Sequence, residues 1–390
     1  MKPRLAAAPL LLIGLAVLPL AEAARDTAPP AGYHVYFGTY TKGGSQGIYR
    51  ARLDVKTGTL SAAVPAAAAR DPSFLAVHPR GEVLYAVEES TDPVKTPGRG
   101  VSAFALDRNS GELTLLNQQT AGGNGPCHLA TDREGACLIV ANYGSGSIEA
   151  IKLLRDGRLG DVGTFIQHTG SSVHPRQKGP HAHGIALSPD NRFALVADLG
   201  LDRVLLYRLQ AGAAKLESHR GAFVALAPGS GPRHLAFDPS GRSVYVINEI
   251  LCTISACRYD PQAGSLTEVQ VMSTLPEGES VKPGYSTAEI AVHPTGRFVF
   301  GSNRGHDSIA VFARDGTTGR LTSVSHHATG GKTPRHFAID PTGTWLLAEN
   351  QASNSVTVFR IDTATGKLTA TGASIEVPSP VCAVFVPAPR

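Results

Sequence analysis

Several features that mark other classes of protein are missing from this sequence of 390 residues. It has no run of lysine or arginine and a formal net charge of only +4, so nothing indicates a nucleic-acid partner. Apolar residues show no sustained helical period after the N-terminus, which argues against a helical fold. No later hydrophobic segment is long enough to span a membrane, so we expect no membrane span in the mature chain.

The five cysteines form no Cys-x-x-Cys motif and show no zinc-ligand spacing, so we expect no metal centre and no cofactor. Cys252 and Cys257 are close enough in sequence to form a disulfide across a loop. The alternative is that the cysteines are small buried hydrophobes, because Cys127, Cys257 and Cys382 lie in strand-like segments.

The N-terminus has the pattern of a secretory signal peptide. Lys2 and Arg4 precede an apolar run over residues 6–20, and Ala21-Glu22-Ala23 supplies a cleavage site of small residues. We therefore predict a signal peptide over residues 1–23, a flexible tail over 24–32, a folded domain over 33–390, and a periplasmic or secreted location.

A four-residue turn, most often containing Pro-x-Gly, returns at intervals of about fifty residues, and such a period indicates a repeat architecture. Proline at the second position presets φ, and glycine at the fourth tolerates a left-handed backbone. β-branched and aromatic residues flank each turn, so each is expected to join two strands. The six turns occupy residues 78–81, 132–135, 188–191, 238–241, 293–296 and 340–343.

A second series of Asp-to-Leu turns runs out of phase with the first, which gives four strands per repeat. Four-stranded repeats of this length predict the blades of an all-β propeller. The six turns account for six blades, and the chain ends supply the seventh, because residues 381–385 resemble an innermost strand and residues 33–40 and 47–53 resemble later ones. Pairing of these N- and C-terminal strands would close a seven-bladed ring. A pair of β-sandwiches is the alternative.

Aligning the repeats on one another brings polar residues to one face, near the ring axis. One column, just before the first strand's core, holds Ser73, Cys127, His183, Arg233, Ala288, Arg335 and Pro380. Another, just after the second strand, holds Glu89, Tyr143, Leu199, Glu249, Arg304 and Gln351. Charged residues are seldom buried without a partner or ligand, so the pattern predicts a polar site at the channel mouth. For a neighbouring column of asparagines we favour the alternative, a hydrogen-bonding belt between blades.

Five short segments, one blade apart, carry a resemblance to a known family: residues 179–183, 231–234, 248–249, 303–304 and 333–337. They resemble the seven-bladed lactonase family, which includes propeller-type 6-phosphogluconolactonases and fungal carboxymuconate-lactonizing enzymes. In the cyclase branch a His, an Arg, a Glu and a second Arg on the channel face form the site. The resemblance therefore implies catalytic roles for His183 (or His181), Arg233, Glu249 and Arg304.

Lactone hydrolysis needs an activated water and a group that stabilises the oxyanion. Glu249 or His183 can accept the proton of the water. Arg233, Arg304 and Arg335 can stabilise the oxyanion or bind a carboxylate or phosphate. The predicted substrate-binding residues are His181, His234, Glu289, Asn303, Arg335 and His336.

Two local patterns suggest other chemistry. His181 and His183 project to one side of an extended segment, so they are a possible pair of metal ligands, although no carboxylate partner is fixed by sequence. Residues 43–47 match Gly-x-Ser-x-Gly but are expected to join two strands, whereas a nucleophile elbow joins a strand to a helix.

The expected partner is a small anionic or polyhydroxyl lactone, such as an unphosphorylated gluconolactone, because phosphorylated sugars are mainly cytoplasmic. A muconate-type cyclase and a non-catalytic binding propeller are the alternatives. A monomer is the default expectation.

Overall fold

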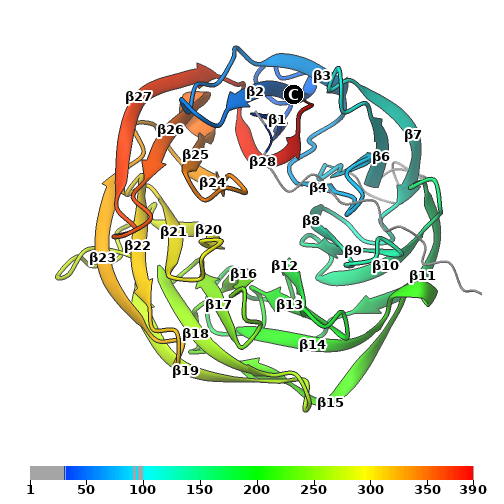
Figure 1. Cartoon of the computed structure of the whole chain (residues 1–390). Helices are drawn as coiled ribbons and strands as arrows, with labels where there is room; N and C mark the ends of the chain where they lie inside the picture. Colours follow the sequence, from blue (N-terminus) through cyan, green and yellow to red (C-terminus); the bar gives the residue numbers. More distant parts are fainter. Residues whose placement is uncertain (1–29, 31, 91–93, 95–99, 390) are drawn as a thin grey trace, which may run out of the picture.

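Seven antiparallel sheets of four strands surround a common axis in the computed structural model of the chain, which describes residues 30, 32–90, 94 and 100–389 (Figure 1). The only helical elements in these residues are two 3₁₀ turns, η1 (Ala211–Ala213) and η2 (Gln351–Ser353). The chain is a seven-bladed β-propeller, as the repeat predicted. No helix among the described residues is long and apolar enough to cross a membrane.

The strands of each blade are given from the innermost outward. The first three blades are β28 (Pro380–Pro387), β1 (Gly32–Thr39), β2 (Gly47–Asp54), β3 (Val64–Ala68); β4 (Leu75–Val77), β5 (Val83–Val87), β6 (Gly100–Leu106), β7 (Leu113–Thr120); β8 (Pro126–Thr131), β9 (Cys137–Asn142), β10 (Ser147–Leu153), β11 (Leu159–Gln167). The next two are β12 (Ala182–Leu187), β13 (Phe193–Asp198), β14 (Arg203–Gln210), β15 (Lys215–Ala225); β16 (Pro232–Phe237), β17 (Ser243–Asn248), β18 (Thr253–Asp260), β19 (Ser265–Ser273). The last two are β20 (Ser286–Val292), β21 (Phe298–Arg304), β22 (Ser308–Arg314), β23 (Leu321–Ala328); β24 (Pro334–Ile339), β25 (Trp345–Asn350), β26 (Ser355–Ile361), β27 (Leu368–Glu376).

The first blade joins the two ends of the chain. β1 pairs antiparallel with β28, and Tyr33 lies opposite Pro387 and Phe37 opposite Ala383. The predicted ring closure is therefore confirmed. It supplies the first blade with an innermost strand and leaves no open sheet edge at the start of the ring.

The recurrent turn between the first two strands of a blade is held by its first residue. In β16–β17, Asp238 Oδ1 accepts hydrogen bonds from the backbone N–H groups of Arg242 (2.9 Å) and Ser243 (2.7 Å). Gly241 adopts a φ of 69° and donates to the Asp238 carbonyl. This left-handed conformation favours glycine. The tight reversal returns the second strand to the face where the first began.

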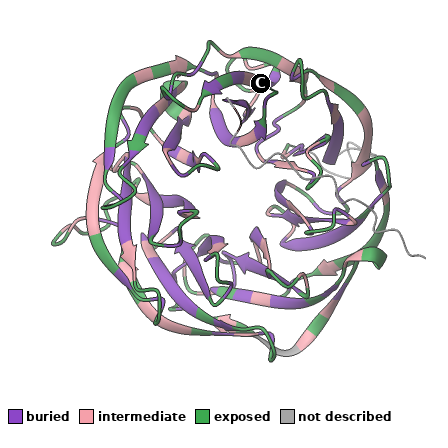
Figure 2. Cartoon of the chain, viewed as in Figure 1, coloured by how far each residue is buried: buried purple, intermediate pink, exposed green. Residues whose placement is uncertain are grey.

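The hydrophobic core lies between neighbouring blades, because each sheet packs on the next. Tyr245 and Ile247 of β17, for example, belong to one buried cluster with Val299 of β21 and Phe312 of β22. Burial decreases outward: the inner three strands of a blade are mostly buried, whereas the outermost strands alternate with solvent (Figure 2). Polar side chains at the inner rim are therefore buried, and they need protein partners or a ligand.

Three expectations concern the ends and the cysteines. The proposed signal peptide lies outside the described residues, as does most of the tail, and the first strand begins at Gly32. All five cysteines are buried and free, so the Cys252–Cys257 disulfide does not form. Residues 43–47 lead from β1 into β2, as expected for a strand-to-strand connection.

Candidate active site

A bulge near the start of the first strand recurs in several blades, and residues of the site lie at these bulges. The register between the first and second strands shifts between Pro126 and His128, Ala182 and Gly184, Pro232 and His234, and Pro334 and His336. A bulged residue is unpaired in the ladder and its side chain is re-aimed. The four residues at the shifts are Cys127, His183, Arg233 and Arg335.

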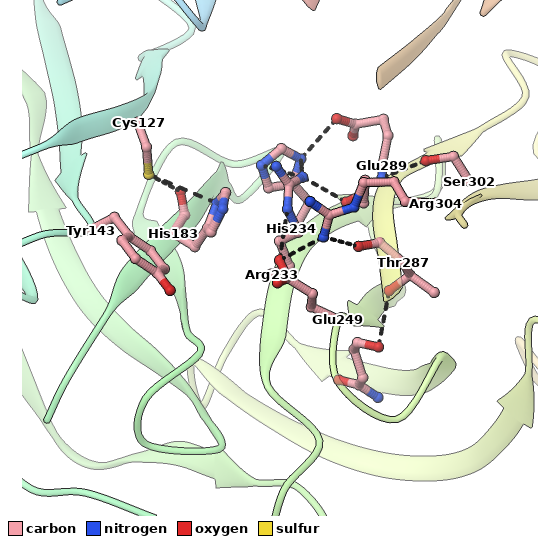
Figure 3. A network of polar contacts seen from close by, with 12 residues as sticks. Cys127, Tyr143, His183, Arg233, His234, Glu249, Thr287, Glu289, Ser302 and Arg304 are labelled. Carbon is pink, nitrogen blue, oxygen red and sulfur yellow. Dashed lines mark hydrogen bonds and ion pairs between the residues drawn. The ribbon is translucent and has the colours of Figure 1, made fainter. Parts of the chain in front are cut away.

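Glu249 is the centre of the charged part of the site and is only 4% exposed. Its Oε2 lies 3.2 Å from Arg233 Nε and 3.0 Å from Arg304 Nη2, and its Oε1 lies 2.6 Å from Arg176 Nη1 (Figure 3 shows Arg233 and Arg304). Burial raises the pKa of Glu249, but the three arginines outweigh burial and lower it to about 2. Glu249 is thus a fixed carboxylate that holds three guanidinium groups.

We call Glu249 and its three arginines the clamp. A cavity of about 190 Å³ opens beside the clamp. Its walls come from six blades and from the loop between β11 and β12. The lining residues are Glu89, Cys127, Tyr143, Arg176, His183, Glu249, Arg304 and Arg335. The cavity is small and mostly charged, so it suits a compact polar molecule.

Arg335 differs from the other arginines of the cavity. Within the described part of the chain, no hydrogen bond or ion pair engages its guanidinium, which lies 5.4 Å from the centre of the Tyr40 ring. The Tyr40 hydroxyl donates to Glu89 Oε2 at 2.8 Å, which fixes that carboxylate on the same side of the cavity. Arg335 is therefore a half-buried cation in the cavity wall whose donors are not used by any hydrogen bond within the described residues.

His183 is 4% exposed and is held from several sides. Its Nδ1 lies 3.8 Å from Cys127 Sγ, and its ring meets Tyr143 and His234 edge to face, with centroid distances of 5.5 and 5.0 Å (Figure 3). Burial, and then the positive charge of Arg233, lower the pKa of His183 well below its usual value. The imidazole is therefore neutral at pH 7, and one of its two ring nitrogens carries a free lone pair.

Behind the cavity, a buried network of histidines and carboxylates surrounds the ring axis. His234 Nδ1 lies 2.8 Å from Glu289 Oε2, and His336 lies 3.5 Å from the same oxygen through Nε2. His336 Nδ1 also lies 2.8 Å from Glu349 Oε2. Burial raises the pKa of Glu289 and, together with the charge of Glu289, raises the pKa of Glu349 well above its usual value. Three predicted substrate-binding residues thus meet one another and do not line the cavity.

Two other predicted residues also lie outside the cavity lining. The Asn303 amide donates to the Thr274 carbonyl at 2.8 Å and to Ser308 at 3.2 Å. Asn248 donates to hydroxyls of its own blade in the same manner, so the asparagine column forms a hydrogen-bonding belt. The His181 ring stacks on Tyr143 at 4.5 Å, and its Nδ1 lies 2.8 Å from the Tyr143 carbonyl.

The described residues contain no group of three or more His, Cys, Asp or Glu side chains placed to hold a metal ion. The pairing of His181 and His183 as metal ligands has no support from this geometry. His181 is instead part of the wall that supports Tyr143, next to the cavity.

Sequence reasoning missed several cavity residues. Cys127, Tyr143 and Glu89 lie in the aligned columns, but the motifs shared with the lactonase family do not include them. Arg176 comes from the long connection between β11 and β12, which lies outside the strands and turns that the repeats share, so aligning the blades does not reveal it. Glu349, which belongs to the network behind the cavity, could have been recognised from the sequence, because it is the only charged residue in the apolar strand β25.

Comparison with known proteins agrees with this geometry. The family described as "Lactonase, 7-bladed beta-propeller" matches residues 34–385. The chain belongs to this family.

Relatives in the family cover nearly the whole chain. A 6-phosphogluconolactonase of Bacillus subtilis is 39% identical over 357 residues, which are 91% of this chain and 98% of that protein. A 6-phosphogluconolactonase of Formosa agariphila is 33% identical over 78% of this chain and 85% of its own length. Among solved structures, the periplasmic gluconolactonase PpgL of Pseudomonas aeruginosa superposes with a TM-score of 0.86 at 33% identity, and the match covers 92% of this chain and all of that one.

Proposed function

We propose that this propeller hydrolyses a sugar-acid lactone in the cavity lined by His183 and Arg335. Its membership of the lactonase family and the names of its relatives support a lactone as the substrate. The observation that carries the proposal is the pairing of an unengaged cation, Arg335, with a neutral buried imidazole, His183, in one small cavity. Ester hydrolysis requires both functions.

In this mechanism His183 accepts a proton from a water molecule as the water oxygen attacks the lactone carbonyl. The tetrahedral oxyanion that forms is stabilised by the guanidinium of Arg335, whose donors are unused in the described chain. Collapse of the intermediate breaks the ring C–O bond, and the proton held by His183 goes to the leaving alkoxide. The product is a hydroxy acid whose carboxyl group releases its proton to the solvent, and the resulting carboxylate faces the arginines.

Glu249 has a different role from the base considered from the sequence. Its low pKa and its three arginine partners make it a poor proton acceptor at neutral pH. We assign it to holding Arg233, Arg304 and Arg176 in place. Arg304 and Arg176 line the cavity and raise its positive potential, which favours the anionic transition state and product.

The substrate we propose is an unphosphorylated gluconolactone. Glu89 and Tyr143 offer hydrogen-bond acceptors for ring hydroxyls, and the small cavity suits a single sugar ring. The similarity to a protein named as a periplasmic gluconolactonase supports the same choice. The N-terminal sequence pattern also supports action outside the cytoplasm, where phosphorylated sugars are scarce.

A titration assay tests the proposal. Acid release is followed by pH-stat with glucono-δ-lactone, its 6-phosphorylated form and a muconolactone, each corrected for spontaneous hydrolysis. We expect saturable release from the unphosphorylated lactone and its loss in His183→Gln. Activity only on the phosphorylated lactone would overturn the substrate, and activity on none of the three would overturn the function.

A further inference from the structure

The sulfur of Cys127 contacts three polar atoms of Ala182 and His183 in the neighbouring blade. Besides its 3.8 Å approach to His183 Nδ1, it lies 3.6 Å from the carbonyl oxygen of His183 and 3.8 Å from that of Ala182 (Figure 3 shows Cys127 and His183). His183 and Cys127 are both at bulges of adjacent blades, so neither position belongs to the regular ladder. We propose that Cys127 is a positioning residue that fixes the tautomer of His183.

The direction of the hydrogen bonds follows from the groups available. Two carbonyl oxygens and the ring nitrogen lie within reach of the single thiol hydrogen, and we assign it to the nearest of these acceptors, the carbonyl of His183. The sulfur then has lone pairs but no hydrogen left for the ring. A neutral imidazole carries one N–H, so Nδ1 must supply the hydrogen between ring and sulfur.

This arrangement leaves the lone pair of His183 on Nε2. No protein group among the described residues is hydrogen-bonded to Nε2, although the His183 side chain is almost fully buried. His183 also lines the cavity. The opposite tautomer would place a hydrogen on Nε2 and present a donor, which cannot take a proton from water. The edge-to-face contacts with Tyr143 and His234 keep the ring from turning over.

Burial keeps Cys127 in the thiol form that the inference requires. Burial, followed by the charge of Glu89, raises the pKa of the Cys127 thiol far above its usual value. The sulfur is thus neither a thiolate nucleophile nor a counterion for an imidazolium. Its contribution is a weak but directional contact, in the place that a carboxylate holds beside the histidine of other hydrolases.

The inference rests on the proposed function for its catalytic meaning, but the tautomer is measurable without any substrate. Protein labelled with ¹⁵N-histidine is studied by two-bond ¹H–¹⁵N correlation, and the His183 signals are assigned by their absence in His183→Gln. We expect Nδ1 to be protonated and Nε2 unprotonated in the wild type. A protonated Nε2 in the wild type would overturn the inference, whatever the activity.

Variants test the part played by the sulfur. Cys127→Ser keeps a group that donates to a carbonyl and accepts from Nδ1, so it should retain the wild-type tautomer and most of kcat. Cys127→Ala should show Nε2–H signal and lose about 10- to 100-fold in kcat with little change in KM, as for other partners that orient a histidine. Cys137→Ala is the matched control, because Cys137 is fully buried in β9 of the same blade and belongs to the hydrophobic core.

The outcomes separate this inference from the proposed function. An unchanged tautomer and unchanged kcat in Cys127→Ala would overturn the role of the sulfur while lactonase activity stood. A wild type without lactonase activity but with the Nδ1–H tautomer, lost in Cys127→Ala and kept in Cys137→Ala, would support the pairing and overturn only the proposed reaction.

Discussion

The Arg233 guanidinium and the Glu249 carboxylate form a buried ion pair (Nε to Oε2, 3.2 Å) from opposite ends of one β-hairpin. Arg233 lies at the bulge that opens β16, and Glu249 follows the last residue of β17. The tight turn at residues 238–241 folds the two strands back, so both side chains reach the same rim. A charge pair this deeply buried depends on both members being present.

Glu249→Gln should therefore lower the free energy of unfolding by about 3–5 kcal/mol near pH 7, because it leaves buried arginines without their counterion. Because the pKa of Glu249 is about 2 in the folded protein and 4.5 in the unfolded reference, its stabilisation is complete above pH 4.5 and is lost as the pH falls towards 2. Denaturant unfolding at several pH values measures this difference. Glu217→Gln is the control, since Glu217 forms a solvent-exposed pair with Lys215 and should leave stability nearly unchanged. Equal effects of the two variants would contradict the clamp.

Arg335→Met should separate activity from stability. No ion pair within the described residues is lost, so the unfolding free energy should remain equal or rise, whereas kcat/KM should fall by about 100- to 1000-fold, as for the loss of an oxyanion donor. Initial rates by pH-stat and a denaturant titration of the same sample give both values. Arg258→Met, an exposed change near the β18–β19 turn, should leave both unchanged. A folded Arg335→Met variant with full activity would show that Arg335 does not stabilise the oxyanion.

The acid limb of the rate profile should lie below the ordinary range of histidine. Burial and Arg233 lower the pKa of His183, so the base stays unprotonated as the pH falls through 6.5. The measurement is log kcat/KM against pH from about 4.5 to 8, with the spontaneous rate subtracted. We expect a level profile across pH 6.5 and a decline only at lower pH. A decline centred at 6.5 or above would show that another group controls the proton transfer.

Glu349→Gln should stabilise the protein at neutral and higher pH. The pKa of Glu349 is raised in the folded state, so the carboxyl stays protonated there, while the unfolded chain ionises above pH 4.5. Its presence thus costs stability increasingly as the pH rises above 4.5, and a neutral amide removes this cost. The difference in denaturation midpoint between variant and wild type should grow from pH 4 to pH 8. A variant less stable than wild type at pH 8 would show that Glu349 is ionised and paired with His336.

The sequence determined the architecture of this protein to a large extent. The turn beginning at Asp238 and its counterparts recur because each needs a side-chain acceptor at its first position and a left-handed residue at its fourth, and all but one have proline at the second. Once the turns fixed the blades, strand alternation placed Arg233, Glu249 and Arg304 on one rim, and the incomplete first and last repeats required β1 and β28 to pair.

Only the tertiary structure decided which of these polar residues face the cavity and which face one another. His234, Glu289 and His336 share the column next to that of Arg233, yet they are joined in a network behind the site. Arg176 comes from a connection outside the repeat, and it joins Arg304 and Arg233 in keeping Glu249 ionised. Distances between side chains of different blades set these pKa values and partners, and a one-dimensional repeat specifies the column of a residue but not the groups that meet it across the ring.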